Sequence, residues 1–128
     1  MLKRVKGDLL AMADAGCFDV IVHGCNCHST RGAGIAAQIA KKWPQAATVD
    51  KRNLLSRTQR LGRWTSCLAT TLIGTKFAIV NAYTQLHFGG KADHFEYEAF
   101  QRILDNLLEW PEGRYGFPYI GMGLANGD

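Results

Sequence analysis

Residues 18–37 read FDVIVHGCNCHSTRGAGIAA and determine the class of fold. Phe18 to His23 is almost continuously apolar, which is typical of a strand buried on both faces of a parallel sheet. A glycine-rich loop follows this strand directly. Apolar residues then recur at helical spacing from Ile35 to Trp43, and Pro44 ends the helix. This unit predicts an α/β domain with residues 18–23 as a central strand.

The N-terminal residues predict an edge strand and a short helix. Leu2–Lys6 alternates apolar and basic side chains, the pattern of a strand with one face on the core. Asp8 is placed to cap a helix over Leu9–Ala15, which Gly16 closes. After the central helix, a more weakly patterned helix is expected from Pro44 to about Asn53.

A hairpin is predicted in the middle of the chain. Arg63–Ile73 and Lys76–Thr84 are rich in β-branched and aromatic residues and meet at a tight turn at Gly74 and Thr75.

The C-terminal part predicts a helix and a last strand. Asp93 with Glu96 has the spacing of a capping box, and an apolar stripe of helical period then runs to Leu108. Residues 115–120 return as a strand before a second glycine-rich loop, residues 121–128. Alternating strands and helices around one hairpin predict a three-layer α/β/α domain with a mixed sheet.

Length and composition fit a single domain over residues 1–128. The chain is 47% hydrophobic, and 15 basic residues against 11 acidic ones leave a formal charge of +4. No apolar run approaches the roughly 18 residues of a membrane helix, and the N-terminus lacks the apolar core of a signal peptide. We therefore expect a cytoplasmic protein without membrane segments, whose four cysteines are free thiols.

Cys25, Cys27 and His28 lie close together but do not predict a metal site. Structural zinc sites have a second ligand pair, which is absent here, and no carboxylate or histidine cluster is placed to hold another cation. Small apolar side chains beside a loop are the preferred interpretation. We expect neither a metal nor a cofactor.

Both glycine-rich loops follow strands, so they are expected at the edge of the sheet where α/β domains bind ligands. Gly32, Ala33 and Gly34 open a helix whose free N–H groups attract anions, although glycines before a helix often only make a turn. Two such loops suit a diphosphate.

Three polar residues near these loops each have two interpretations. Asn26 can bind a sugar hydroxyl or belong to a turn. Asp8 can accept a hydrogen bond from an adenine amino group or cap a helix. His23 can be a general acid or base, or a hydrogen-bonded core histidine, which spacing alone favours.

At this point the chain resembles the macro domain family, an ADP-ribose-binding α/β fold. The matching segments occur in order along the chain: Lys6–Leu9, Val20–Cys27, Gly32–Ala36, Tyr83–Thr84 and Ile120–Leu124. The resemblance implies ADP-ribose as ligand and a role for each matching residue. Asp8 and Leu9 would lie at the adenine, Asn26 at the distal ribose with Tyr83 and Thr84 bordering it, Gly32, Ala33, Gly34 and Ile35 at one phosphate, and Gly121, Met122, Gly123 and Leu124 at the other.

Within the family, the segment around His23 is most similar to small ADP-ribose 1''-phosphate phosphatases of yeast type. That similarity implies His23 and Asn26 as catalytic residues and ADP-ribose 1''-phosphate as substrate. A related branch removes ADP-ribose from proteins or nucleic acids with a lysine and an aspartate, but Gln85 and Ala125 occupy the matching positions here. The sequence is also compatible with a non-catalytic reader of ADP-ribosylated macromolecules, and with a protein that binds RNA or poly(ADP-ribose).

The end of the chain departs from the family. Macro domains usually continue with a helix packed on the sheet, whereas this sequence ends at Asp128. We therefore expect either a truncated chain or a short, phage-like version that lacks this C-terminal helix, of undetermined oligomeric state.

Overall fold

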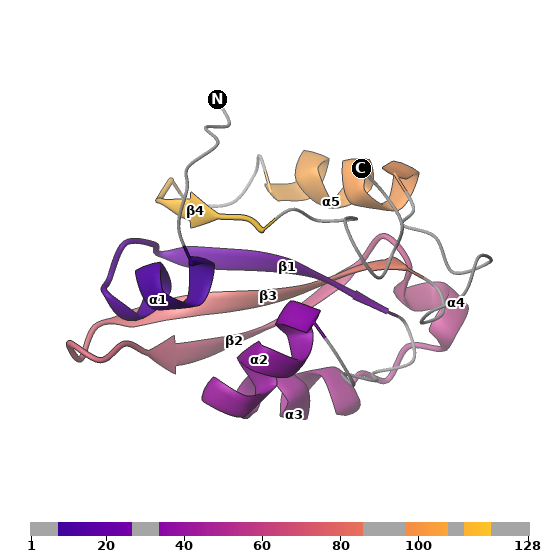
Figure 1. Cartoon of the computed structure of the whole chain (residues 1–128). Helices are drawn as coiled ribbons and strands as arrows, with labels where there is room; N and C mark the ends of the chain where they lie inside the picture. Colours follow the sequence, from indigo (N-terminus) through magenta and orange to yellow (C-terminus); the bar gives the residue numbers. More distant parts are fainter. Residues whose placement is uncertain (1–7, 27–33, 86–96, 108–111, 119–128) are drawn as a thin grey trace.

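The computed structural model describes residues 8–26, 34–85, 97–107 and 112–118. Figure 1 shows the arrangement of their helices and strands. In chain order these are α1 (Leu9–Asp14), β1 (Val20–Asn26), α2 (Gly34–Lys42), α3 (Gln45–Lys51), α4 (Arg57–Arg60), β2 (Trp64–Thr70), β3 (Lys76–Gln85), α5 (Tyr97–Leu107) and β4 (Tyr115–Gly116). The predicted strand Leu2–Lys6, the capping box at residues 93–96 and the second glycine-rich loop lie outside the described residues.

The described strands form one mixed sheet in the order β2-β3-β1-β4. β1 is parallel to β3 and β4, whereas β2 is antiparallel to β3. The predicted central strand is confirmed, because β1 has a neighbour on each side. In its register with β3, Val20 pairs with Ala78 and His23 with Asn81. The carboxyl ends of these two parallel strands therefore lie side by side.

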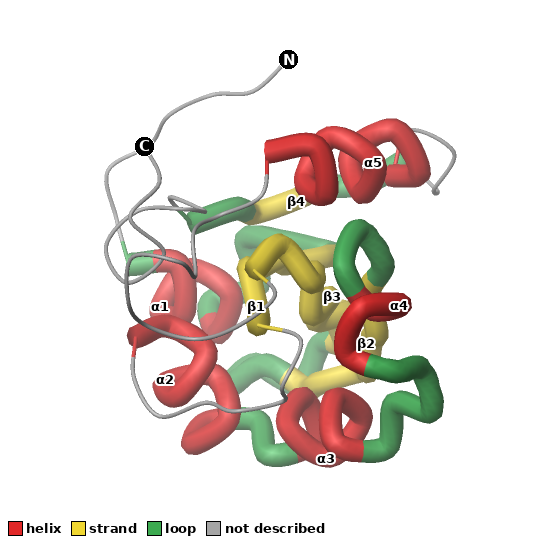
Figure 2. Tube along the Cα trace, turned by 90° about the vertical axis from the view of Figure 1, so that its right-hand side faces the viewer, coloured by secondary structure: helices red, strands yellow, loops and turns green. Residues whose placement is uncertain are grey.

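Helices cover both faces of the sheet, which confirms the predicted α/β/α layers (Figure 2). Helices α1, α2 and α3 pack on one face and α5 on the other, and alternate residues of β1 serve the two cores. The buried residues of the first core are Leu10, Ala13, Ile21, Ile39, Trp43, Ala46, Ala69, Phe77 and Ile79, and those of the second are Val22, Val80, Ala82 and Ile103. Trp43 packs edge-on against Phe77, with ring centroids 5.1 Å apart.

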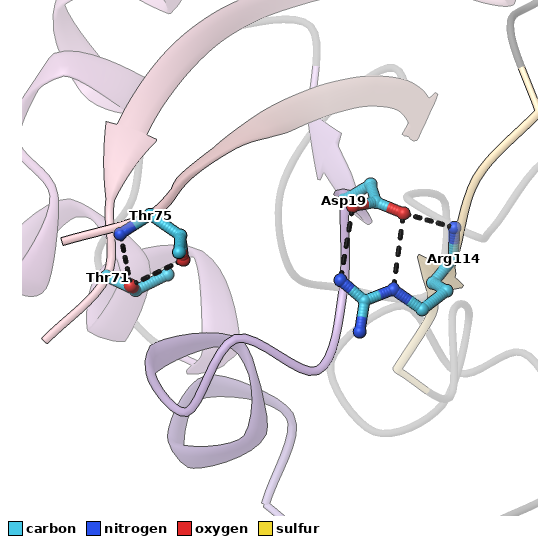
Figure 3. A network of polar contacts seen from close by, with 4 residues as sticks. All are labelled: Asp19, Thr71, Thr75 and Arg114. Carbon is cyan, nitrogen blue, oxygen red and sulfur yellow. Dashed lines mark hydrogen bonds and ion pairs between the residues drawn. The ribbon is translucent and has the colours of Figure 1, made fainter. Parts of the chain in front are cut away.

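A pair of threonines closes the predicted hairpin (Figure 3). The Thr71 hydroxyl accepts a hydrogen bond from Thr75 N at 3.1 Å and lies 2.8 Å from the Thr75 hydroxyl. Gly74 has a φ of +86°, a conformation that favours glycine in such a turn. The hairpin is thus confirmed, but its first strand ends at Thr70 and not at the predicted Ile73. The turn is longer than predicted, because Thr71 N donates to the Thr75 carbonyl and Gly74 N to the Thr71 carbonyl.

Asp19 holds β4 against the start of β1 (Figure 3). Its carboxylate accepts hydrogen bonds from Arg114 N at 2.7 Å, Nε at 3.3 Å and Nη2 at 3.2 Å. The Arg114 side chain, followed by its backbone N–H, lowers the pKa of Asp19. Strand β4 covers only Tyr115–Gly116 of the predicted 115–120. Phe117 and Pro118 lie outside the ladder, and Pro118 has no N–H to donate, while residues 119 and 120 lie outside the described residues.

Candidate functional site

The candidate ligand site lies at the carboxyl edge of the parallel strands. β1 ends at Asn26 and β3 at Gln85, and these two residues pair after an irregularity in the ladder at Cys25. The chain then leads into the nine-residue helix α2, which begins at Gly34 with a φ of +70°. This glycine, which has no Cβ, and the positive end of the helix dipole at the start of α2 are features that suit an anion.

Asp8 and Leu9 lie at the start of α1. Asp8 Oδ1 accepts hydrogen bonds from Leu10 N at 2.9 Å and Ala11 N at 3.3 Å, so the predicted helix cap is confirmed. Leu9 is half-buried against the first core. Contact of either residue with an adenine stays a prediction.

The other predicted ligand residues divide into described and undescribed ones. Ile35 is half-buried and packs on the first core, while the Gly34 backbone is exposed. Thr84 is buried and follows Tyr83 along β3, so these two side chains point to opposite faces of the sheet. Gly32, Ala33, Gly121, Met122, Gly123 and Leu124 lie outside the described residues.

His23 is completely buried between β1 and the helices of the first face. Its Nε2 lies 2.7 Å from Asn81 Oδ1, and its ring nitrogens lie 3.7 Å from Cys25 Sγ. This geometry is that of a hydrogen-bonded core histidine, which was one of the two interpretations of His23. Its catalytic role stays a prediction.

Asn81 determines which ring nitrogen of His23 carries the proton. Its Nδ2 donates to the Ala46 carbonyl and to Thr65 Oγ1, both at 3.0 Å, so the amide oxygen is the atom that faces the imidazole. An oxygen that only accepts requires a proton on His23 Nε2. In the neutral ring Nδ1 then holds the lone pair, and a proton-transfer role would fall to that nitrogen.

Tyr83 continues this buried polar cluster toward α3. Its hydroxyl donates to Asp50 Oδ1 at 2.6 Å and lies 3.0 Å from Thr65 Oγ1. Burial, followed by the hydrogen bond to the Asp50 carboxylate, raises the pKa of Tyr83 above its ordinary value of 10. The phenol therefore remains neutral and acts here as a donor, and its ring is completely buried.

Sequence reasoning missed three members of this cluster, Asn81, Thr65 and Asp50. A signal for the first is present in the sequence, because an asparagine that interrupts the apolar run Phe77–Ala82 must find buried partners if that run is a central strand. Asp50 carried no comparable signal, because a charged residue near the end of a weakly patterned helix is usually solvated.

Cys17, Cys25 and Cys67 are free thiols in the structure, and no group of three potential metal-ligating side chains occurs within the described ranges. None of the described helices is long and apolar enough to span a bilayer.

Comparison with known proteins identifies relatives of the sequence, although no family model matches it. Over its whole length the chain is 31% identical, across 134 aligned residues, to an uncharacterized 17.5 kDa protein of Enterobacteria phage T4 from the tk-vs intergenic region. The match covers 83% of the phage protein. A shorter segment of 47 residues, 36% of this chain, is 43% identical to 30% of the ADP-ribose 1''-phosphate phosphatase of Candida albicans.

Solved structures share the fold. The macrodomain of Mycobacterium tuberculosis DarG aligns with a TM-score of 0.74 at 24% identity, over 100% of this chain and 82% of that one. The macrodomain of Thermus aquaticus DarG aligns with a TM-score of 0.68 at 20% identity, over 96% of this chain and 79% of that one. The structure of Thermosipho africanus DarTG in complex with ADP-ribose aligns with a TM-score of 0.68 at 15% identity, over 94% of this chain and 33% of that one. The chain therefore belongs to one family with the 17.5 kDa protein of phage T4, and the fold of this family is that of the macro domains.

Proposed function

We propose that the chain binds ADP-ribose and hydrolyses ADP-ribose 1''-phosphate to ADP-ribose and inorganic phosphate. The observation that supports this most directly is the 47-residue segment with 43% identity to an ADP-ribose 1''-phosphate phosphatase. The same fold binds ADP-ribose in one solved neighbour. The glycine at the start of α2, next in sequence to the loop after β1, adds a local reason to expect a phosphate there.

In the proposed reaction, the diphosphate anchors the ligand and water attacks the phosphorus of the terminal phosphate. The bond from phosphorus to the 1'' oxygen breaks, and the ribose leaves as a hydroxyl that has gained a proton. Binding energy from the adenosine and diphosphate positions the reacting group. Asn26 would orient the ribose, and His23 would transfer the proton through Nδ1, because Nε2 is engaged with Asn81.

The first test is calorimetric titration with ADP-ribose, with AMP and ribose 5-phosphate as controls. Micromolar binding of ADP-ribose, together with much weaker binding of both fragments, supports the ligand assignment. No binding at high micromolar concentration contradicts both the ligand and the enzyme.

The second test measures phosphate release from ADP-ribose 1''-phosphate. We expect His23→Ala to abolish turnover and leave ADP-ribose affinity nearly unchanged. Thr65→Val is the matched control, because it disturbs the same buried cluster without removing the imidazole. Equal turnover in wild type and His23→Ala would remove His23 from the mechanism.

The burial of His23 favours a second candidate, a reader that binds ADP-ribose without chemistry. An imidazole with no exposed surface and a 2.7 Å hydrogen bond to Asn81 is placed as a structural element. The reader hypothesis expects ADP-ribose binding with no phosphate release above the buffer rate. The two tests above separate the reader from the phosphatase.

A further inference from the structure

A hollow of about 370 Å³ lies away from the first core, between the chain that enters β2 and helix α5. It is lined by Leu61, Gly62, Arg63, Trp64, Arg102 and Asn106, and we call it the arginine pocket. Its volume falls within the roughly 300 to 1,000 Å³ typical of small-molecule sites. Neither the sequence motifs nor the proposed function uses these residues.

Gly62 brings one guanidinium of the pocket against the backbone. The residue has a φ of +81°, and a Cβ added there would lie 2.9 Å from Arg102 Nε and 3.1 Å from its Nη2. Any other residue would strain the backbone and push the Arg102 side chain aside. The glycine therefore lets the guanidinium lie directly over the main chain.

The two arginines lack carboxylate partners in the described part of the chain. The ion pairs that the structure shows there join Lys42 to Asp14 and Arg114 to Asp19. Asp105, close to Arg102 on α5, instead accepts a hydrogen bond from Gln101 at 2.9 Å. Two exposed arginine residues line one hollow. Their guanidinium groups suit phosphate oxygens, which guanidinium binds in a bidentate manner.

The pocket is attached to the end of β3. Gly62 N donates to the Tyr83 carbonyl and Tyr83 N to the Arg63 carbonyl, both at 2.9 Å, and Trp64 pairs with Ala82. A ligand there would sit beside the last residues of the strand that borders the candidate site.

We propose that the arginine pocket binds a phosphate-bearing ligand of nucleotide size. Arg63 and Arg102 contact the phosphate oxygens, and Trp64 and Asn106 line the remaining space for the attached organic group. A mononucleotide and a phosphodiester of a nucleic-acid strand share this chemistry. This inference does not depend on the proposed function, because it uses none of the residues assigned to ADP-ribose.

The test records the amide signal of Gly62, the Nε signal of Arg102 and the indole signal of Trp64 by NMR. AMP, inorganic phosphate and a single-stranded oligothymidylate are added separately. We expect these signals to shift with AMP or with the oligonucleotide, and the tighter probe identifies the source of the phosphate. Arg63→Gln and Arg102→Gln should each weaken that binding at least about fivefold, and for the oligonucleotide each should also lower the salt dependence.

Lys76→Gln is the control, because it removes the same charge from an exposed lysine at the opposite end of β3. It should change the affinity less than twofold. Equal losses in all three variants, or no shift of the pocket signals with any probe, would overturn the proposal. The arginine variants should bind ADP-ribose as wild type does, so failure of the pocket and failure of the proposed function give different results.

Discussion

Asn81 is the residue that joins the buried polar side chains into one cluster. It accepts from His23 and donates to the Ala46 carbonyl and the Thr65 hydroxyl, so its amide links β1, α3 and β2. Buried polar groups cost free energy unless each is paired, and this residue pairs three at once.

Asn81→Leu keeps the side-chain size but removes the hydrogen bonds to His23, the Ala46 carbonyl and the Thr65 hydroxyl. We expect the free energy of unfolding to fall by about 2 to 4 kcal/mol, because a buried N–H, a carbonyl and a hydroxyl lose their partner. Urea denaturation at neutral pH measures the loss. Ser66→Ala, on the exposed part of β2, is the control and should stay within about 0.5 kcal/mol. A loss no larger than that of the control would show that Asn81 contributes nothing to stability.

For single residues, the sequence indicates which positions carry polar side chains of interest, but it leaves the role of each side chain open. Asp8 was expected either to cap a helix or to bind adenine, and the cap is present. His23 was expected to be catalytic or structural, and only its partner on β3 shows how the ring is held. That partner is 58 residues away, so no local pattern could reveal the pair.

Among the elements, the entry into β2 depends on a glycine with positive φ. Gly62→Ala and Gly74→Ala impose the same backbone conformation on alanine, at a cost of about 1 to 2 kcal/mol each. Gly62→Ala should cost more in urea denaturation, because its Cβ also displaces Arg102, whereas nothing lies within 4 Å of a Cβ at Gly74.

A double variant isolates the contribution of that side chain. With Arg102→Ala present, the difference between the two glycine variants should disappear. A difference that persists would assign the extra cost to the backbone at Gly62.

The attachment of β4 to β1 should depend on pH through Asp19. Because Arg114 lowers the folded-state pKa of this carboxylate below its ordinary value of 3.8, the pair stabilises the fold fully above that value. The contribution is lost as the pH falls through the folded-state pKa. Asp19→Asn should therefore be less stable than wild type at pH 7, with the gap narrowing toward pH 3 in urea denaturation. A gap independent of pH would contradict the role of the charge.

Elements with a strong hydrophobic period were predictable from the sequence, and elements that rest on specific polar contacts were not. The central strand, the following helix and the hairpin all occur close to the expected residues. Helix α4 was missed, although Ser56 and Gln59 form a capping box with reciprocal bonds of 3.4 and 3.0 Å. Four residues are too few for a helical period, so a capping signal without an apolar stripe carried no weight.

For the whole molecule, a ligand that binds only the folded state must raise its stability. At a concentration of one hundred times Kd, ADP-ribose should add about 2.7 kcal/mol, which corresponds to a rise in Tm of roughly 8 to 14 °C. Differential scanning fluorimetry measures the shift, with ribose 5-phosphate at equal concentration as control. An unchanged Tm at saturating ADP-ribose would contradict specific binding.

The parallel pairing of β1 with β3 also constrains when the sheet can fold during synthesis of the chain. Val20 meets Ala78 in the ladder, and Asp19 meets Arg114, 95 residues further along. Contacts so distant in sequence make folding slow, since a long loop must close before the centre of the sheet can form. During synthesis β1 therefore waits for most of the chain to leave the ribosome, and its apolar run from Val20 to Val22 lacks its β3 neighbour until then, which is when such a segment is prone to aggregate.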